Sequence, residues 1–187
     1  MNTDTVTAIV VNCSNPSQAH QQALNLRRQT KPPDQLMLGC CCYDSYHSPL
    51  AGSFDRIVYA PHENDWGHRF CDAGIRLANT EWLMFANSDD HYDMQFIEIL
   101  TGLGDQHTAD LVMCDYTTYQ RHGGLIQTKP EVGSVTRGSF IVRTEIARIV
   151  GYNHRVYEAD GLFVEALVRA GATYQVWSGN PLLFQHL

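Results

Sequence analysis

The sequence predicts an α/β fold in which a mainly parallel sheet is flanked by helices and extended by a β-hairpin. Three observations predict it. Short, continuous apolar runs alternate with segments of helical periodicity over residues 1–109, an order that implies strand–helix–strand units with right-handed crossovers. These runs lack the polar alternation of half-exposed strands, which indicates burial on both faces. Beyond residue 109, a Gly-Gly turn between two strand-like segments indicates the hairpin.

The first strand and helix are marked by their boundaries. Residues 6–11 form a β-branched apolar run, which predicts a buried strand. Ser14 or Asn15 then offers a side-chain cap, and Pro16 suits the first turn of a helix. Pro32 and Pro33 are expected to end that helix.

The other elements of the first half are predicted from helical spacing of apolar residues or from short apolar runs typical of strands. Apolar side chains recur at helical spacing in two further segments, around residues 70–78 and 96–103. Strands are expected at residues 36–42, 56–60 and 82–86.

The pattern changes in the second half. Residues 111–119 and 125–128 flank Arg121-His122-Gly123-Gly124, which predicts a hairpin that extends the same sheet. Short strands are expected at 139–142 and 174–177, and helices at 144–150 and 160–170, the latter ended by Gly171.

Composition and charge narrow the functional class. The chain has 187 residues, of which 44% are hydrophobic and 18% charged, as in an ordinary globular domain. Thirteen basic and 20 acidic residues leave a net charge of −7, the wrong sign for neutralising nucleic-acid phosphates. We therefore expect a single domain over residues 1–187 that does not bind nucleic acid.

The cysteines and the N-terminus indicate the compartment. Three of the six cysteines, Cys40 to Cys42, are consecutive in a strand-like run and are interpreted as small buried hydrophobes with reduced thiols. Residues 1–5 lack a basic segment, and the apolar run after them breaks off at Asn12, too early for a signal peptide or a membrane helix. We expect a cytoplasmic protein without a transmembrane segment.

Polar clusters follow three of the expected strands. They are Asn12 with Cys13, Asp44 with Ser45, and the run from Asn87 to Asp90. Open α/β sheets bind ligands outside the carboxyl ends of their strands. The three clusters are therefore candidates for one binding site.

The third cluster is the most informative. Carboxylates held on a tight turn at a sheet edge suit a hard divalent cation such as Mg²⁺ or Mn²⁺, whose shell is completed by substrate phosphates and water. The alternative is that Asp89 or Asp90 caps the following helix. The pattern alone leaves both open.

A second acidic group, Glu158-Ala159-Asp160, begins the long late helix. Acidic residues at a helix N-terminus are favoured by the helix dipole, by about 0.3–1 kcal/mol. The other interpretation is a general base, which requires a carboxylate aimed at a substrate hydroxyl.

The sequence lacks the motifs of several other enzyme and binding-site classes. The chain has no phosphate-binding P-loop, no nucleophile elbow and no zinc-protease helix. His68 and Cys71 have a spacing that could share a metal, but a surface histidine and a buried cysteine explain them better. Trp66, Trp82 and Trp177 could stack on a sugar ring, although buried aromatic side chains are commoner.

The order of these features resembles the family 2 glycosyltransferases, which have the GT-A fold. Residues 7–30 resemble the family's opening nucleotide-binding unit. Residues 36–45 resemble its second strand, with Tyr43-Asp44-Ser45 in place of the Asp-Gly-Ser-type ending. The segment from Asn64 through Gly67 to Ala78 is similar to the family's Asn-x-Gly segment and the helix after it.

The resemblance continues to the end of the late helix. Residues 82–90 resemble the strand that delivers the D-x-D metal motif. Residues 138–143 and 160–171 resemble the acceptor-side strand and the helix whose first acid is the base. The match implies a near-minimal GT-A catalytic domain, with a nucleotide-sugar-binding half at 1–109 and an acceptor-side half at 110–187.

The resemblance implies a metal-dependent, inverting glycosyltransferase. It would move a sugar from a nucleoside diphosphate, with UDP as the expected nucleotide, to a saccharide or other hydroxyl acceptor. Asp89 would bind the Mn²⁺ or Mg²⁺ that bridges the diphosphate, and Asp160 would deprotonate the acceptor. His186 would be a second metal ligand, or else a frayed terminal residue. The residues expected to contact the donor are Asn12, Asp44 at the nucleobase, Gly67, Asn87, Ser88 and Asp89.

Two departures from the family pattern keep alternatives open. Asn87 stands where the first acid of D-x-D is expected, and Ala159 stands where a glutamate precedes the base. A catalytically weak nucleotide-sugar-binding module is therefore one alternative. A nucleotidyltransferase is the other, although residues 12–18 contain neither the glycine nor the lysine that its phosphate loop would need.

Overall fold

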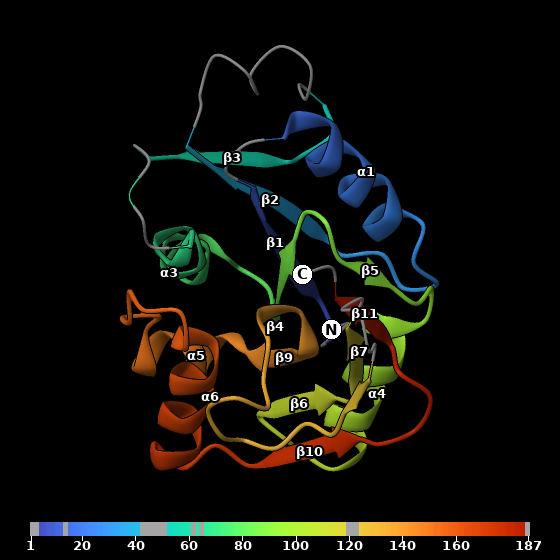
Figure 1. Cartoon of the computed structure of the whole chain (residues 1–187), viewed down its shortest axis with the longest axis vertical. Helices are drawn as coiled ribbons and strands as arrows, with labels where there is room; N and C mark the ends of the chain where they lie inside the picture. Colours follow the sequence, from blue (N-terminus) through green and yellow to red (C-terminus); the bar gives the residue numbers. More distant parts are fainter. Residues whose placement is uncertain are drawn as a thin grey trace.

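A mainly parallel seven-stranded sheet forms the centre of the molecule (Figure 1). The computed structural model describes residues 4–12, 15–41, 52–60, 63, 66–118 and 124–185. All neighbouring strands of this sheet run parallel except β9, which is antiparallel to both its neighbours. In spatial order the strands are β10 (Tyr174–Trp177), β6 (Leu111–Cys114), β9 (Phe140–Arg143), β4 (Trp82–Asn87), β1 (Val6–Asn12), β2 (Gln35–Cys40) and β3 (Arg56–Tyr59). The predicted α/β class is confirmed.

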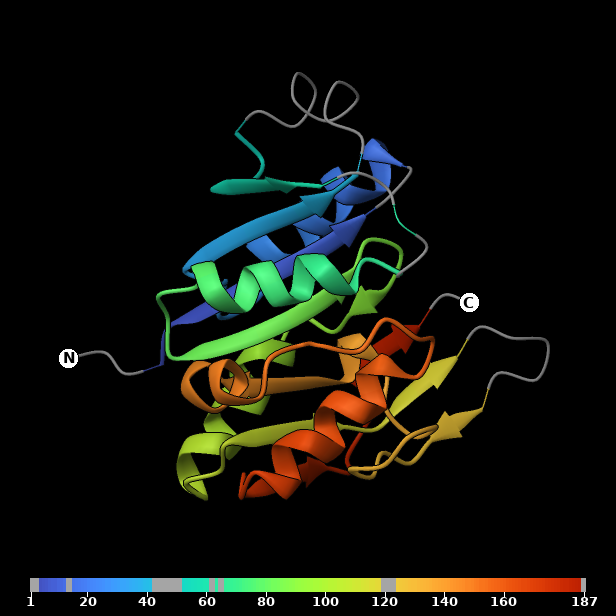
Figure 2. The ribbon, with the colours of Figure 1, turned by 90° about the vertical axis from the view of Figure 1, so that its left-hand side faces the viewer.

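Helices cover both faces of the sheet (Figure 2). Along β1, Val6, Ala8 and Val10 pack in one apolar cluster while Ile9 and Val11 pack in another, because neighbouring strand side chains point to opposite faces. The first cluster includes α1 (Pro16–Arg27) and α4 (Phe96–Gln106). The second includes α3 (His68–Leu77), α5 (Thr144–Val150) and α6 (Ala159–Arg169). This double burial explains the unbroken apolar runs.

The helix boundaries follow their capping chemistry. Of the two predicted caps for α1, Asn15 is confirmed, because its Oδ1 accepts hydrogen bonds from the main chain of Ser17 and Gln18 at 3.1 and 3.3 Å. The helix ends at Arg27, several residues before the prolines. The strand expected at 36–42 ends at Cys40, Cys41 is buried after it, and Cys42 lies outside the described residues.

The predicted hairpin forms, but not as an extension of the main sheet. The strand expected at 111–119 is interrupted at the buried Asp115, whose Oδ1 accepts a hydrogen bond from Thr128 N–H at 2.8 Å. Beyond it lies a separate four-stranded sheet in the order β5 (His91–Tyr92), β11 (Leu183–Gln185), β7 (Tyr116–Thr118) and β8 (Leu125–Ile126). The hairpin pair β7–β8 is completed by β11 from the far end of the chain.

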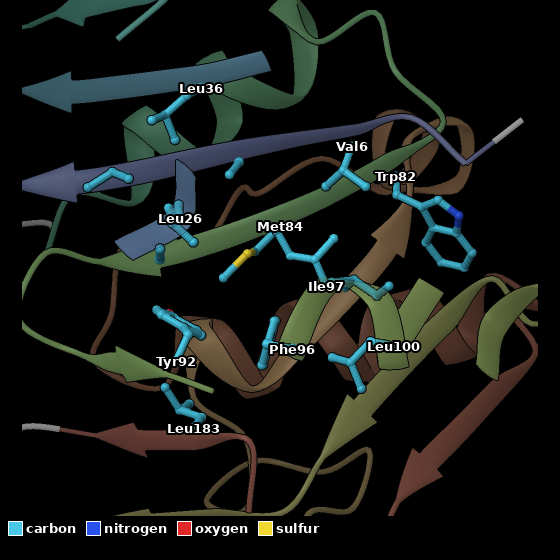
Figure 3. Packing of buried hydrophobic residues seen from close by; sticks show 14 of the residues in the cluster. Val6, Leu26, Leu36, Trp82, Met84, Tyr92, Phe96, Ile97, Leu100 and Leu183 are labelled. Carbon is cyan, nitrogen blue, oxygen red and sulfur yellow. The ribbon is translucent and has the colours of Figure 1, made fainter. Parts of the chain in front are cut away.

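The small sheet is fixed to the main core through apolar side chains. Figure 3 shows Tyr92 and Leu183 beside Phe96, in the same cluster as Leu26, Met84 and Trp82. The rings of Tyr92 and Phe96 meet edge to face, with centroids 4.9 Å apart. Over the described part of the chain, none of the helices combines the length and the apolarity that crossing a membrane requires.

Two glycines of α4 provide a matched test of this packing. A methyl group at Gly104 would lie 2.5 Å from Trp82 Cη2, whereas one at Gly102 would meet nothing within 4 Å. Both Gly→Ala changes favour the helix by about 0.5–1 kcal/mol. Overpacking costs about 1–3 kcal/mol, so Gly104→Ala should lower the free energy of unfolding and Gly102→Ala should raise it. Urea unfolding measures both, and equal effects would contradict the packing described.

Candidate active site

The carboxyl ends of β1 and β4 and the start of α6 border a cavity of about 660 Å³. It therefore lies at the sheet edge where open α/β folds bind ligands. The predicted site residues that line it are Asn12, Asn87, Ser88, Asp89 and Asp160. Gly67 is the N-cap of α3, next to the lining residue Trp66. Asp44 and His186 lie outside the described residues.

Asn12 ties the ends of two strands together. Its Nδ2 donates to Ser88 Oγ at the end of β4 and to the main-chain carbonyl of Asn15 at 3.0 Å. Its Oδ1 accepts from Asn15 N–H at 2.9 Å. The contact is possible because β1 and β4 pair in parallel, with Val11 opposite Asn87. One polar side chain thus joins two of the segments that are predicted to bind the donor.

The turn after β4 separates its two acids. Asp90 is buried, and its Oδ2 accepts a hydrogen bond from Asn87 Nδ2 at 3.0 Å. Asp89 is partly exposed and lines the cavity. Neither acid caps α4, whose N-cap position is Gln95. The capping alternative for Asp89 and Asp90 is therefore wrong, and Asp89 is the carboxylate of this turn that a ligand can reach.

Asp160 accepts hydrogen bonds from two other segments of the chain. Its Oδ2 accepts from the main-chain N–H of Arg137 at 2.9 Å, and its Oδ1 accepts from the Tyr152 hydroxyl. The nearest side-chain cations are Arg137 Nε at 3.7 Å and His68 Nε2 at 4.0 Å, the latter charged only when protonated. Burial, together with the charge of Asp160, raises the pKa of Tyr152 well above its usual value. The phenol therefore stays a donor, and the carboxylate is oriented rather than merely placed at a helix start.

Arg137 is the central residue that sequence reasoning missed. It begins the 3₁₀ turn η1 (Arg137–Ser139), and its side chain is buried. Nη1 donates to Asn87 Oδ1 at 3.3 Å, and Nη2 donates to the Trp66 carbonyl at 2.9 Å. Arginine is always charged and offers several donors in a fixed plane. Its guanidinium therefore joins the turn after β4, the start of α3 and the base candidate Asp160.

His68 is buried, not a surface residue as expected. Its side chain is 1% exposed, and its ring centroid lies 5.6 Å from that of Tyr152. The expected surface position was wrong, because the apolar pattern of this helix was read from Phe70 onward and did not include His68. His68 lies one turn before Cys71, on a face of α3 that is also covered. Within the described ranges, no group of three or more His, Cys, Asp or Glu side chains could hold a metal ion.

Comparisons with known proteins agree with this architecture. The profile described as "Glycosyl transferase family 2" matches residues 44–163. The crystal structure of S. aureus TarS superposes with a TM-score of 0.76 and 14% identity, covering 98% of this chain and 37% of that chain. No curated protein matches the chain.

Two further structures of S. aureus TarS, residues 1–349, hold ligands. They contain UDP and UDP-GlcNAc, and each has a TM-score of 0.76 and 16% identity over 98% of this chain. The present chain covers 60% and 58% of those chains. At this level of identity the likeness shows a shared fold, and the chain spans less than two thirds of each of these proteins.

The hydrogen bond that orients Asp160 can be tested by a pair of Tyr→Phe changes. Tyr152→Phe removes a donor to a partly buried carboxylate, so the free energy of unfolding should fall by about 1.5–3 kcal/mol. Tyr174→Phe, on the exposed side chain of β10, should change it by less than about 0.5 kcal/mol. Urea unfolding of both variants gives the comparison, and a Tyr152 variant as stable as the wild type would contradict the contact.

Proposed function

The chain belongs to the family 2 glycosyltransferases and has the GT-A fold, and from this premise we propose that it transfers a sugar from a nucleoside diphosphate to an acceptor hydroxyl. The observation that carries the proposal is that Asp89 and Asp160 line the same cavity, although they are far apart in the sequence. Asp89 lies in the turn after β4, and Asp160 lies in the first turn of α6. Direct displacement of a leaving diphosphate by an alcohol needs these two kinds of group in one place.

The donor is proposed to lie along the ends of β1 and β4. Asn12, Asn87, Ser88 and Asp89 line the cavity there. The resemblance to the family implies that Asp44 binds the nucleobase. Gly67, at the start of α3, is proposed to let the backbone approach the donor. UDP as the nucleotide is supported by the similar structures that hold UDP and UDP-GlcNAc.

A divalent cation fits Asp89 better than Asn87. The Oδ1 of Asn87 already accepts from Arg137, and its Nδ2 donates to Asp90. Mg²⁺ typically takes only one or two protein carboxylates and completes its shell with phosphate and water. We propose that Asp89 binds Mn²⁺ or Mg²⁺, with His186 as the second protein ligand. Such an ion offsets the negative charge that develops on the departing nucleoside diphosphate.

Asp160 is proposed as the base of an inverting transfer. As the acceptor oxygen bonds to the anomeric carbon, the bond from that carbon to the diphosphate breaks, and the hydroxyl proton passes to Asp160. A single displacement of this kind inverts the anomeric centre. Tyr152 and the main chain of Arg137 hold the carboxylate, so it needs little reorganisation when the acceptor arrives.

Two observations favour a catalytically weak nucleotide-sugar-binding module: the neutral Asn87, and Ala159 where a glutamate is expected before the base. The products separate the candidates. Sugar transfer releases UDP from UDP-GlcNAc, nucleotidyl transfer would form or consume pyrophosphate, and a binding module would bind the donor without acceptor-stimulated release.

Replacing the base should stop transfer without weakening donor binding. Asp160→Asn should reduce acceptor-dependent UDP release by about 10²–10⁴-fold, the usual contribution of a general base. UDP affinity measured by calorimetry should stay close to that of the wild type, because the base acts on the acceptor. Glu158→Gln, two residues earlier and on the same cavity, is the matched control and should retain activity. Turnover near the wild-type rate in Asp160→Asn would remove this residue from the mechanism.

If Asp89 binds the metal, replacing it should abolish the effect of Mn²⁺ on UDP binding. In the wild type, Mn²⁺ should tighten UDP binding, whereas in Asp89→Ala the affinities with and without Mn²⁺ should converge. The Mn²⁺ affinity of the UDP complex should fall at least about tenfold, since even indirect partners of metal ligands cost 10–100-fold. Glu158→Gln should keep the Mn²⁺ effect. Unchanged Mn²⁺-assisted binding in Asp89→Ala would refute the assignment.

A further inference from the structure

Two exposed aromatic side chains line the cavity beside Asp160. Trp66 is 54% exposed and Tyr157 is 69% exposed, and both border the cavity. Their rings meet edge to face, with centroids 6.1 Å apart and planes at 74°. Ligand pockets are typically lined by hydrophobic and aromatic side chains, and a contiguous exposed apolar patch beside one is typical of a ligand-binding groove.

The backbone holds Trp66 in an unusual conformation. Its φ of 51° is in the left-handed region, which a tryptophan seldom adopts. Gly67 follows with a φ of 78°, and a Cβ there would lie 2.3 Å from Val11 Cγ1. The Trp66 carbonyl accepts from Arg137 Nη2 at 2.9 Å. Outliers of this kind persist where the surroundings determine them, commonly at functional sites.

The same contacts place the aromatic pair on the acceptor side. Arg137 contacts Trp66 through its side chain and Asp160 through its main chain. Tyr157 lies in the turn that leads into α6, just before Asp160. The His68 ring, 4.0 Å from Asp160, has its centroid 6.1 Å from that of Trp66. The aromatic pair therefore lies next to Arg137 and His68, the residues that contact the proposed base Asp160.

The other two tryptophans, Trp82 and Trp177, make contacts away from the cavity. Trp82 is fully buried, and the Arg143 guanidinium lies over its ring at 3.9 Å from the centroid. Trp177 Nε1 donates to the Asn180 carbonyl at 3.1 Å. Of the three tryptophans that sequence analysis considered for sugar stacking, Trp66 is the one that lines the cavity.

We propose that Trp66 and Tyr157 form an acceptor subsite that packs against the apolar C–H face of a pyranose ring, so that the acceptor is a saccharide. This inference rests on the proposed function, because Asp160 defines the acceptor side. A β-linked gluco-configured ring presents axial C–H groups on its faces and hydroxyls around its edge. Packing on the aromatic pair removes apolar surface from water and leaves an edge hydroxyl directed to Asp160. A linear alcohol phosphate has no such face.

Calorimetric titration of the full chain tests the subsite, with UDP and Mn²⁺ present. The probes are cellotriose and N-acetylchitotriose, with glycerol 3-phosphate as the linear alcohol. At least one trisaccharide should bind the wild type. Trp66→Ala and Tyr157→Ala should each weaken it about tenfold, whereas Trp66→Phe and Tyr157→Phe keep a ring and should recover much of the affinity. Trp177→Phe is the matched control and should bind as the wild type does.

UDP titration of the same variants separates the two proposals. UDP affinity should not change in Trp66→Ala, and circular dichroism should show that this surface variant is folded. Loss of UDP binding in Trp66→Ala with trisaccharide binding intact would place the indole on the nucleotide and overturn the subsite. Trisaccharide affinity equal to the wild type in both Ala variants, no trisaccharide binding to the wild type, or preference for glycerol 3-phosphate would also overturn it. A wild type that binds trisaccharide through Trp66 but never UDP would instead defeat the proposed function.

Discussion

The buried guanidinium of Arg137 is the constraint on which the site depends. A charge removed from water is costly unless it is paired and hydrogen-bonded. Asp160 supplies the opposite charge, and Asn87 and the Trp66 carbonyl accept the hydrogen bonds. These partners come from α6, β4 and the start of α3. The hydrogen bonds and the ion pair of Arg137 therefore hold three elements around the cavity. They fix the positions of the polar residues Asn87 and Asp160 and of the aromatic residue Trp66.

The same network explains why an amide occupies position 87. Asn87 accepts from Arg137 through Oδ1 and donates to Asp90 through Nδ2 at 3.0 Å. A carboxylate can only accept, so an aspartate here would face the carboxylate of Asp90 at hydrogen-bond distance. The departure from the family's D-x-D pattern is thus matched to a buried acid on one side and a buried cation on the other. It leaves Asp89 as the acid of this turn that lines the cavity.

The second sheet braces the turn that carries Arg137. Gln185 of β11 donates from Nε2 to Thr136 Oγ1 at 2.8 Å, directly before η1. On the other side of the turn, a Cβ at Gly138 would lie 2.4 Å from the Tyr92 hydroxyl of β5, so a side chain at this position would displace that hydroxyl. The small sheet is therefore part of the support of the site, although its strands are short and β5 and β11 lie far from the hairpin in the sequence.

Local periodicity in the sequence was enough to predict β1, β4, α3 and α4, because burial on a regular element repeats along the chain. The place of the polar residues that end β1 and β4 at one binding site was also predictable, because the carboxyl ends of parallel strands meet at one edge of the sheet. Asp160 followed from the order of motifs. Three features depend on contacts between distant segments and could not be predicted in this way: the second sheet, the burial of His68 and the contacts of Arg137. Arg137 meets Asn87 across 50 residues and Trp66 across 71, and a hydrogen bond between such distant residues leaves no periodic trace in the sequence.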